Sequence, residues 1–270
     1  MRGRPLTLML GMALTGLFVA AALLAAVWTP HDVTAIDVAV RLRPPDAAHW
    51  LGTDQLGRDL LSMILAGATV SLAVASASVA AALAIGIPLG LTAAARPGWI
   101  DELVMRSGDL IFAFPSLLLA ILLTAVIGPG ATSATLAIAL FNIPVFARLA
   151  RGEGRRLASR DFIAAARLAG KGRARIAIEH VLPNILLSII VQATIQIALA
   201  LIVEAGLSYV GLGTQPPQPS WGRMLADAQT LMGIAPRLAI VPGGAILLAV
   251  FGITLTGDGL GQRQRRRQGR

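Results

Sequence analysis

The chain has 270 residues, of which 56% are hydrophobic and only 14% are charged, whereas an ordinary soluble domain carries about 25% charged residues. Together with a mean hydropathy of +0.73, this composition excludes a typical soluble enzyme or binding domain and favours a membrane protein. The absence of cysteine excludes disulfides and thiolate metal sites, and the three histidines are too scattered along the sequence to indicate a metal cluster, so no metal site is predicted.

Six stretches are long and apolar enough to cross a bilayer, which takes roughly 20 mostly apolar residues. They are residues 6–28, 69–95, 110–127, 131–149, 185–203 and 238–256. The first is longer than the apolar core of a signal peptide, so we expect an uncleaved helix there. The third and fourth are separated only by "GPGAT", a turn sequence that predicts an antiparallel pair.

The basic residues give the orientation. Six crossings put both termini on one side, and that side holds all but five of the 23 lysines and arginines. The five on the other side are Arg41, Arg43, Arg58, Arg223 and Arg237. By the positive-inside rule, both termini and the basic block near residues 150–180 are cytoplasmic. The net charge of +9 is therefore a topology signal, and no nucleic-acid partner is predicted.

Two segments on the outer side carry tryptophan beside amphipathic stretches. They are residues 29–68, which contain Trp50, and residues 207–237, which contain Trp221. Tryptophan at a membrane boundary is typical of helices lying in the interface. We therefore expect both tryptophans to be interfacial anchors.

Residues 161–184 form a basic block between two apolar stretches. Asp161 is the predicted N-cap of a short helix. Apolar residues then recur along one helical face, namely Phe162, Ala165, Ala166 and Ala169. Gly170 follows where a left-handed residue would end the helix.

A second short helix is predicted from Arg173. It repeats the same apolar spacing in Ala174, Ala177, Ile178 and Val181. Pro183 has no N–H to donate and disfavours helix at Leu182, so the helix is expected to stop there. The two narrow stripes of small side chains allow two readings. They either dock in a groove of a partner protein or pack back on the membrane helices of this chain, with the arginines facing lipid phosphates.

The block resembles the loop of binding-protein-dependent ABC importer permeases, whose pattern is Glu-Ala-Ala, three residues, Gly, nine residues, Ile, one residue, Leu-Pro. Five positions match, namely Ala165, Ala166, Gly170, Leu182 and Pro183. Two depart from it, since Ala164 replaces the Glu and His180 the Ile. "LGTDQLGRDLLSMILAGATVSL" and "SYVGLGTQPPQPSWGRMLADA" resemble the dipeptide/oligopeptide/nickel branch, and within it the C-type subunit, the second of two permeases. The resemblance extends from about residue 45 onward.

This resemblance implies partners and a location. It implies a bacterial inner-membrane protein that pairs with a second, different permease subunit, with two ATP-binding subunits that carry ATP and Mg²⁺, and with an extracytoplasmic solute-binding protein. It also implies that the loop docks into a groove of an ATP-binding subunit, which favours the partner reading. The coupling residues so implied are Asp161, Phe162, Ala164, Ala165, Ala166, Ala169, Gly170, Leu182 and Pro183.

The departure at Ala164 has a predicted local cost. If Asp161 is the N-cap, residue 164 is the third helical residue, where a Glu would complete a capping box. Alanine loses that contact but has the best helix propensity. We expect loop ordering to change by about 0.5–1 kcal/mol, without loss of docking.

Motifs for catalysis are not found in the sequence. "LAGKGRA" contains a Gly-Lys pair but lacks the earlier glycine and the following hydroxyl of a phosphate-binding loop. There is no His-Glu-x-x-His and no Gly-x-Ser-x-Gly. The chain is therefore predicted to be a transport subunit rather than an enzyme. Glu179 is read as the partner of a neighbouring arginine, and His180 as a cap or interface residue.

Polar residues inside the spans have two readings, because they are costly unless they face protein or water. Asn142, Gln192 and Gln196 either line a translocation path or form hydrogen bonds between helices. Gly86 and Gly90 have the spacing of a close helix contact, beside Pro88. Glu204 and Asp258 lie near span ends and are predicted to be interfacial rather than parts of a proton relay.

The sequence thus predicts an all-α polytopic membrane protein with about six transmembrane helices, cytoplasmic termini and short cytoplasmic coupling helices. Residues 1–68 form the first helix and an outer segment. Residues 69–260 form a five-helix core with the coupling loop 150–183, and residues 261–270 form a basic tail. The predicted function is a permease subunit of an ABC importer that moves a peptide or related small solute by ATP-driven alternating access. An ion-coupled secondary transporter is the alternative, and a membrane-embedded enzyme ranks last because no nucleophile and base pair up.

Overall fold

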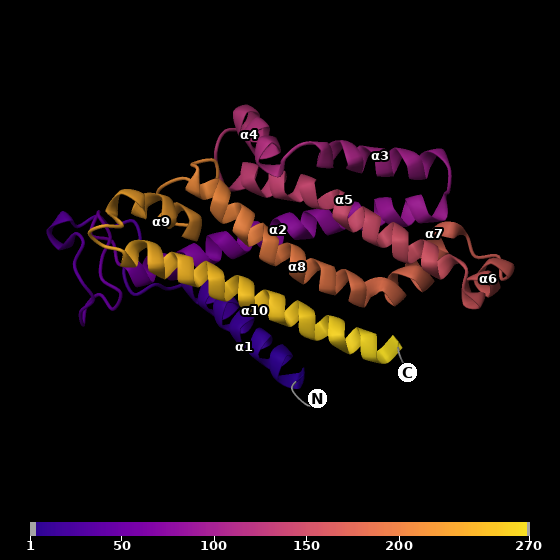
Figure 1. Cartoon of the computed structure of the whole chain (residues 1–270), viewed down its shortest axis with the longest axis horizontal. Coiled ribbons are helices and arrows are strands. Elements are labelled where there is room, and N and C mark those ends of the chain that lie inside the picture. The colour runs from indigo at the N-terminus through magenta and orange to yellow at the C-terminus, as the bar shows by residue number, and fades with distance from the viewer. Residues whose placement is uncertain (1–3, 269–270) are drawn as a thin grey trace.

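A computed structural model describes residues 4–268, without the side chains of residues 4, 5, 116 and 263–268. Five long helices run along its long axis (Figure 1). They are α1 (Arg4–Ala25), α2 (Leu60–Ala95), α5 (Ala131–Ala158), α8 (Leu182–Tyr209) and α10 (Arg237–Gln268). The described residues contain no strand, only an isolated bridge between Thr53 and Asp59. The predicted all-α fold is confirmed.

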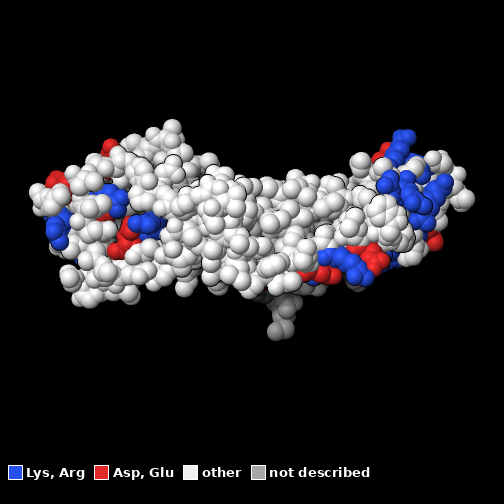
Figure 2. Space-filling model, turned by 90° about the horizontal axis from the view of Figure 1, so that it is seen from above, with Lys and Arg blue, Asp and Glu red and all other residues white. Residues whose placement is uncertain are grey.

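The charge distribution matches a membrane protein. Each of the five long helices contains a segment apolar enough to cross a bilayer, and a helix pair bent by 90° makes a sixth if it counts as one span. Figure 2 shows a broad uncharged belt between two charged ends, the basic groups gathering at the end that carries α6 in Figure 1. At about 1.5 Å per residue, the 36 residues of α2 reach about 54 Å, well beyond a hydrocarbon core of about 30 Å.

The third predicted span, residues 110–127, is not one straight helix. It is divided between α3 (Trp99–Ala113) and α4 (Ser116–Ile127), which meet at 90°. Pro115 has no N–H and forces Phe114 into an extended conformation, with φ −97° and ψ 136°, which ends α3. The expected continuous helix is therefore wrong.

The antiparallel pair predicted for residues 110–127 and 131–149 does not form as one pair of helices; it is α3, mostly before residue 110, that runs antiparallel to α5. Asp101, early in α3, pairs with Arg151 and Arg155 late in α5. Asp109, late in α3, pairs with Arg148, which precedes them in α5. The glycine turn lies where predicted, with Gly128 at φ +96°, and α4 also packs on α5.

Helices α2 and α5 form the most extensive helix contact among the described residues. A Cβ at Gly86 would lie 2.6 Å from the Ile143 carbonyl oxygen, and one at Gly90 would overlap the carbonyl of Ala147. The absence of side chains at these two positions lets the backbones meet, as the spacing of the glycines predicts. On the opposite side, α1 packs along α10 and α2.

The end opposite α6 is built from irregular chain. It contains η1 (Val38–Val40), α9 (Trp221–Ala228) and η3 (Gln229–Leu231). Trp50 is 71% exposed, but Trp221 is wholly buried, so the interfacial anchor expected at Trp221 is wrong. Its indole N–H donates to the Ile64 carbonyl at 3.0 Å, and its ring meets Phe18 edge-on at 5.6 Å. The fold of α9 onto α2 and α8 removes this ring from the membrane surface.

Candidate coupling surface and membrane path

The first helix of the basic block, α6 (Asp161–Leu168), begins one residue earlier than predicted. The Arg160 carbonyl accepts from the N–H groups of Ile163 at 3.0 Å and Ala164 at 3.2 Å, which makes Arg160 the N-cap. The N-cap role predicted for Asp161 is wrong: this residue is the first of the helix and makes no capping hydrogen bond. Residue 164 is then the fourth helical residue, where a glutamate cannot close a capping box.

The end of α6 is as the sequence predicts. Gly170 has φ +77°. The Gly170 N–H donates to the Arg167 carbonyl oxygen at 3.0 Å, and the Lys171 N–H donates to the Ala166 carbonyl oxygen at 3.1 Å. These two bonds form a Schellman motif, which needs a left-handed residue and hence favours glycine.

The side chains of α6 divide into two faces. Ile163 and Ala166 are 1% and 7% exposed and point into this chain. The other members of the predicted stripe are exposed, Phe162 at 43%. Leu168, which is not part of the predicted stripe, is 90% exposed. The outward residues, which we call the coupling surface, are Phe162, Ala164, Ala165, Leu168 and Ala169. The stripe predicted from sequence thus splits, because only Ala166 of its four members packs inward.

A large cavity separates α6 from the end of α2. It has a volume of about 520 Å³ and lies between Leu91, Pro97 and Gly154 on one side and Ile163 and Arg167 on the other. Ile163 is the one α6 side chain that is almost completely enclosed. Few α6 side chains are therefore buried against the rest of the chain, whereas most of them are exposed.

The helix stop predicted at Pro183 is wrong. The short helix α7 (Arg173–Ile176) continues through a π-helical turn, η2 (Ala177–Val181), into α8. In the wide turn the Leu182 N–H donates to the Ala177 carbonyl, five residues back, and Pro183 becomes the second residue of α8. The side-chain amide of Asn184 donates to the His180 carbonyl at 2.7 Å and so satisfies a group near the proline. π turns accommodate such interruptions without ending a helix.

Ion pairs reinforce this continuous segment. Glu179 accepts from Lys171 at 2.7 Å and from Arg175 at 2.6 Å, so its predicted pairing with a neighbouring arginine is confirmed. His180 lies 2.9 Å from the Lys171 ammonium. Leu182 is half-buried and Pro183 is exposed.

Two of the three polar residues predicted for the translocation path meet in the bundle. The amide of Gln196 in α8 donates to Asn142 in α5, and Asn142 donates to the Ile138 carbonyl at 2.9 Å. Both are 6% exposed. They also border a cavity of about 160 Å³ between α4, α5 and α8. Gln192 is half-buried and is not part of this lining. The Asn142–Gln196 pair therefore links α5 to α8 and borders this cavity.

Glu204 is the polar residue that the sequence misplaces. It is wholly buried rather than interfacial, because α8 continues to Tyr209 and the chain after it folds back over this position. Ser208 donates to its carboxylate at 2.7 Å. Three further hydroxyls surround it, those of Ser71, Thr214 and Ser220. Helical spacing gives a signal for this burial, since Glu204 follows the buried Leu201 by three residues. Asp258, by contrast, is exposed.

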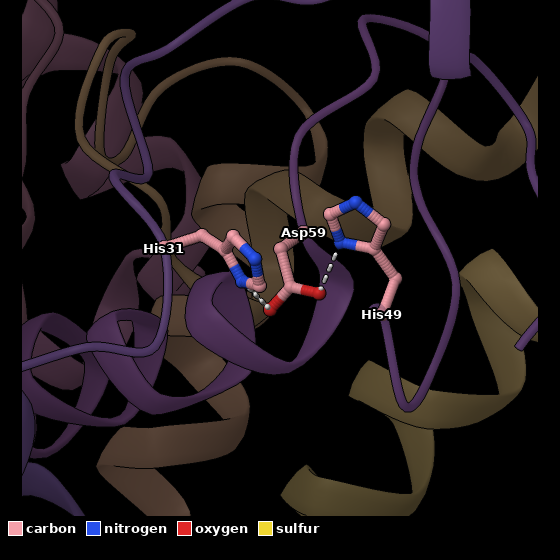
Figure 3. Close-up of side chains that lie close together, drawn as sticks. All are labelled: His31, His49 and Asp59. Atoms are coloured by element: carbon pink, nitrogen blue, oxygen red, sulfur yellow. Dashed lines mark hydrogen bonds and ion pairs between the residues drawn. The ribbon is translucent and has the colours of Figure 1, made fainter. Parts of the chain in front are cut away.

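Two of the three histidines lie closer together in space than their sequence positions indicate. His31 and His49 converge on Asp59 at the end of the molecule away from α6 (Figure 3). Their separation along an irregular segment hides this cluster from any periodic pattern.

Comparison with known proteins identifies relatives of this chain in sequence and in fold. The profile of the family described as "binding-protein-dependent transport system inner membrane component" matches residues 86–268. The dipeptide transport system permease protein DppC of Alkalihalophilus pseudofirmus is 41% identical over 250 residues, which cover 93% of this chain and 82% of the relative. The glutathione transport system permease protein GsiD of Pectobacterium atrosepticum is 44% identical over 250 residues, which cover 91% and 83%. Among solved structures, the inward-facing MetNI methionine ABC transporter has a similar fold, with a TM-score of 0.59 and 20% identity over 73% of this chain and 93% of that chain.

Proposed function

Because this chain belongs to the family of inner-membrane components of binding-protein-dependent transport systems, it is a permease subunit of an ABC importer, and we propose that its cargo is a dipeptide or a small peptide-like solute such as glutathione. It is a transport subunit and not an enzyme, and ATP hydrolysis belongs to a separate subunit in such systems. The cargo proposal rests on the relatives, which are named for dipeptide and glutathione transport. The ion-coupled transporter considered from the sequence is set aside.

In the proposed assembly, the chain spans the bacterial inner membrane with α6 and both termini in the cytoplasm. It pairs with a second, different permease, two ATP-binding subunits and an extracytoplasmic solute-binding protein. ATP and Mg²⁺ are held by the ATP-binding subunits. The basic end of the molecule in Figure 2 supports this orientation, because basic residues favour the cytoplasmic side.

The observation that carries the coupling role is the exposed apolar face of α6. Leu168 is 90% exposed and Phe162 43% exposed, beside the small exposed residue Ala165. Helix α6 lies at the charged end, outside the uncharged belt, where lipid tails would not cover it. A groove in an ATP-binding subunit covers these side chains in our proposal, as an amphipathic helix docks through its apolar face.

The same geometry offers a route for movement. In this proposal, force on α6 reaches α5 and α7, on which α6 packs, and Ile163 and Ala166 are the buried side chains of this helix. From α7 the force passes without interruption through the π turn into α8. Helix α8 carries Gln196, which bonds Asn142 beside the cavity of about 160 Å³. We place the translocation path at this meeting of α4, α5 and α8, where a shift of α8 would part or close the contact.

Cysteine crosslinking tests the proposal directly, because the chain has no cysteine of its own. Leu168→Cys should capture an ATP-binding subunit in membranes that contain all partners. The matched control is Val38→Cys, an exposed apolar position, 60% exposed, at the opposite end. A membrane-impermeant maleimide should label residue 168 in inside-out vesicles and residue 38 in right-side-out vesicles. Labelling of residue 168 from outside, or capture of the ATP-binding subunit by residue 38, contradicts the proposal.

A further inference from the structure

Three potential metal ligands meet at the end of the molecule opposite α6, which we call the outer end after the proposed orientation. His31 and His49 come from the irregular chain between α1 and α2, and Asp59 is the N-cap of α2. Figure 3 shows the carboxylate between the two imidazole rings. The rings themselves lie close, with centroids 4.7 Å apart and planes inclined by 35°. Segments separate in sequence thus present two nitrogen donors and one carboxylate to a common point.

The distances suit a single ion. The Nδ1 atom of His49 lies 3.0 Å from one Asp59 oxygen, and the Nδ1 atom of His31 lies 3.7 Å from the other. One ligand atom from each residue falls within 4.8 Å of the others. For metal–ligand bonds of about 2.1 Å, two ligands in tetrahedral geometry stand about 3.4 Å apart. The two observed distances, each to a different oxygen of Asp59, lie on either side of that value, so the three side chains need to draw together around a bound ion from separations of up to 4.8 Å.

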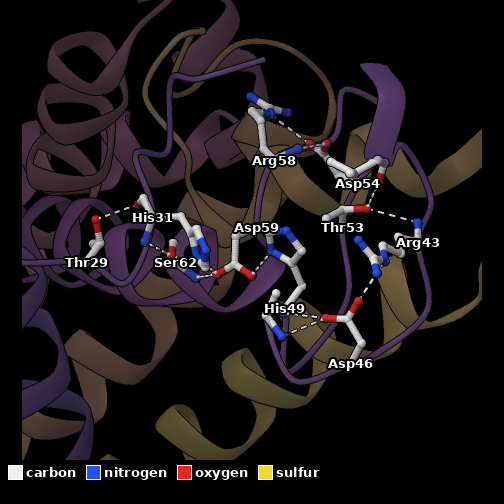
Figure 4. A network of polar contacts seen from close by, with 12 residues as sticks. Thr29, His31, Arg43, Asp46, His49, Thr53, Asp54, Arg58, Asp59 and Ser62 are labelled. Carbon is white, nitrogen blue, oxygen red and sulfur yellow. Dashed lines mark hydrogen bonds and ion pairs between the residues drawn. The ribbon is translucent and has the colours of Figure 1, made fainter. Parts of the chain in front are cut away.

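The ligands are held in place by neighbouring groups (Figure 4). Asp59 is 3% exposed and accepts from both the backbone N–H and the hydroxyl of Ser62 at 2.8 Å. Burial alone would raise the pKa of the Asp59 carboxyl, but hydrogen bonds from Ser62 and His49 outweigh it, so the pKa lies below its usual value. Asp46 accepts from the His49 backbone N–H at 2.7 Å and fixes that loop. Such supporting contacts are the usual means by which metal ligands are oriented.

Solvent can reach the cluster. A cavity of about 430 Å³ borders His31 and Asp59 and is flanked by Trp28 and Trp50. The His31 side chain is 42% exposed. This opening leaves room for a water or another ligand at a fourth coordination position.

We propose that His31, His49 and Asp59 bind one divalent transition-metal ion at the outer face. Two imidazoles and one carboxylate with a free fourth position are a ligand set that Zn²⁺ accepts. The bound ion would join the irregular segment of residues 26–59 to the start of α2. This inference does not depend on the transported solute or on the coupling role of α6.

Zinc titration of the purified full-length chain tests the site. The protein carries a tag without histidine, is treated with a chelator and is titrated calorimetrically with Zn²⁺. One ion per chain should bind, and His31→Gln and His49→Gln should each weaken binding at least tenfold. His180→Gln is the matched control, since it removes the third histidine of the chain, which lies in η2 directly after α7, and should leave the affinity unchanged.

Two variants separate metal binding from folding. His31 donates a hydrogen bond from its backbone N–H to the Ser62 hydroxyl oxygen at 2.9 Å, and a glutamine keeps this bond, so His31→Gln should keep the unfolding temperature of the metal-free protein. Asp59→Asn keeps an N-cap acceptor but removes the charge, and it should also weaken Zn²⁺ binding. Zn²⁺ should raise the unfolding temperature of the wild type and not that of His31→Gln. No saturable binding, or equal binding by the His31→Gln/His49→Gln double variant, overturns the proposal and leaves the His49–Asp59 contact as a hydrogen bond alone.

Discussion

The two ends of the molecule differ in how far their ion pairs are buried: the Arg58–Asp54 pair at the outer end is largely buried, whereas the Arg175–Glu179 pair near α6 is largely exposed. Arg237, also at the outer end, donates to the carbonyls of Leu42 and Arg43, some 195 residues away. At the α6 end, apolar side chains such as Leu168 are left uncovered.

This difference separates what folding needs from what assembly needs. A buried polar group must find its partner within the chain, because leaving it unpaired costs about 1–3 kcal/mol. An exposed apolar face outside the membrane belt has no partner within the chain. Exposed apolar patches of this kind mark interaction sites. The outer end is therefore expected to respond to mutation through stability, and the coupling surface through transport.

The largest expected effect comes from two adjacent alanines of α6. Ala165→Glu places a charge on the exposed coupling surface and should reduce solute-stimulated ATPase activity and uptake at least tenfold, with an unchanged unfolding temperature. Ala166→Glu places the charge at a buried position and should also destabilise the chain, by about 2 kcal/mol or more. Uptake in proteoliposomes and thermal unfolding in detergent measure the two effects.

These neighbours also control for each other. Both are alanine, both receive the same charge, and they differ in the face of α6 on which they lie. Normal uptake by a well-inserted Ala165→Glu variant would show that the coupling surface is not a docking surface. An Ala165→Glu variant as unstable as Ala166→Glu would show that α6 packs on its own chain through both faces.

The outer end should show the reverse response, with Glu204 as the test. Glu204→Ala removes the acceptor of the Ser208 hydroxyl and leaves a space among three further hydroxyls, so it should lower the free energy of unfolding by about 1–3 kcal/mol. Glu204→Gln keeps an oxygen acceptor and should lose less. Thermal unfolding of the two variants in detergent gives the comparison.

Transport rate per folded molecule should stay near the wild-type value in both Glu204 variants. A Glu204→Gln variant that folds normally but no longer transports would contradict the purely structural role. It would place the carboxylate in the transport cycle.

The sequence predicts those features of the fold that depend on local pattern. Apolar length predicts the spans, and the left-handed conformation at Gly170 is predicted by the residue type that tolerates it. The spacing of Gly86 and Gly90 predicts the close contact of α2 with α5 without naming the partner helix. Each of these predictions needs only neighbours within one or two helical turns.

The features that the sequence does not predict depend on distant contacts. Trp221 is buried because α9 folds onto Phe18 and Ile64, which lie more than 150 residues away. The π turn lets the helix continue past Pro183, where the local rule predicts an end. The histidine cluster joins irregular segments that have no periodicity to read.

The smallest expected effect is at Ala164, where the sequence departs from the family pattern. Because α6 begins at Asp161, residue 164 lies one position beyond the capping box, and its side chain is exposed on the coupling surface. Ala164→Glu should therefore change the free energy of unfolding by less than about 0.5 kcal/mol. A change in coupling without a change in stability would mean that a glutamate there acts on the partner protein. We expect coupled ATPase activity within twofold of the wild type, because the apolar residues Phe162 and Leu168 supply the exposed contact area and this variant leaves them intact.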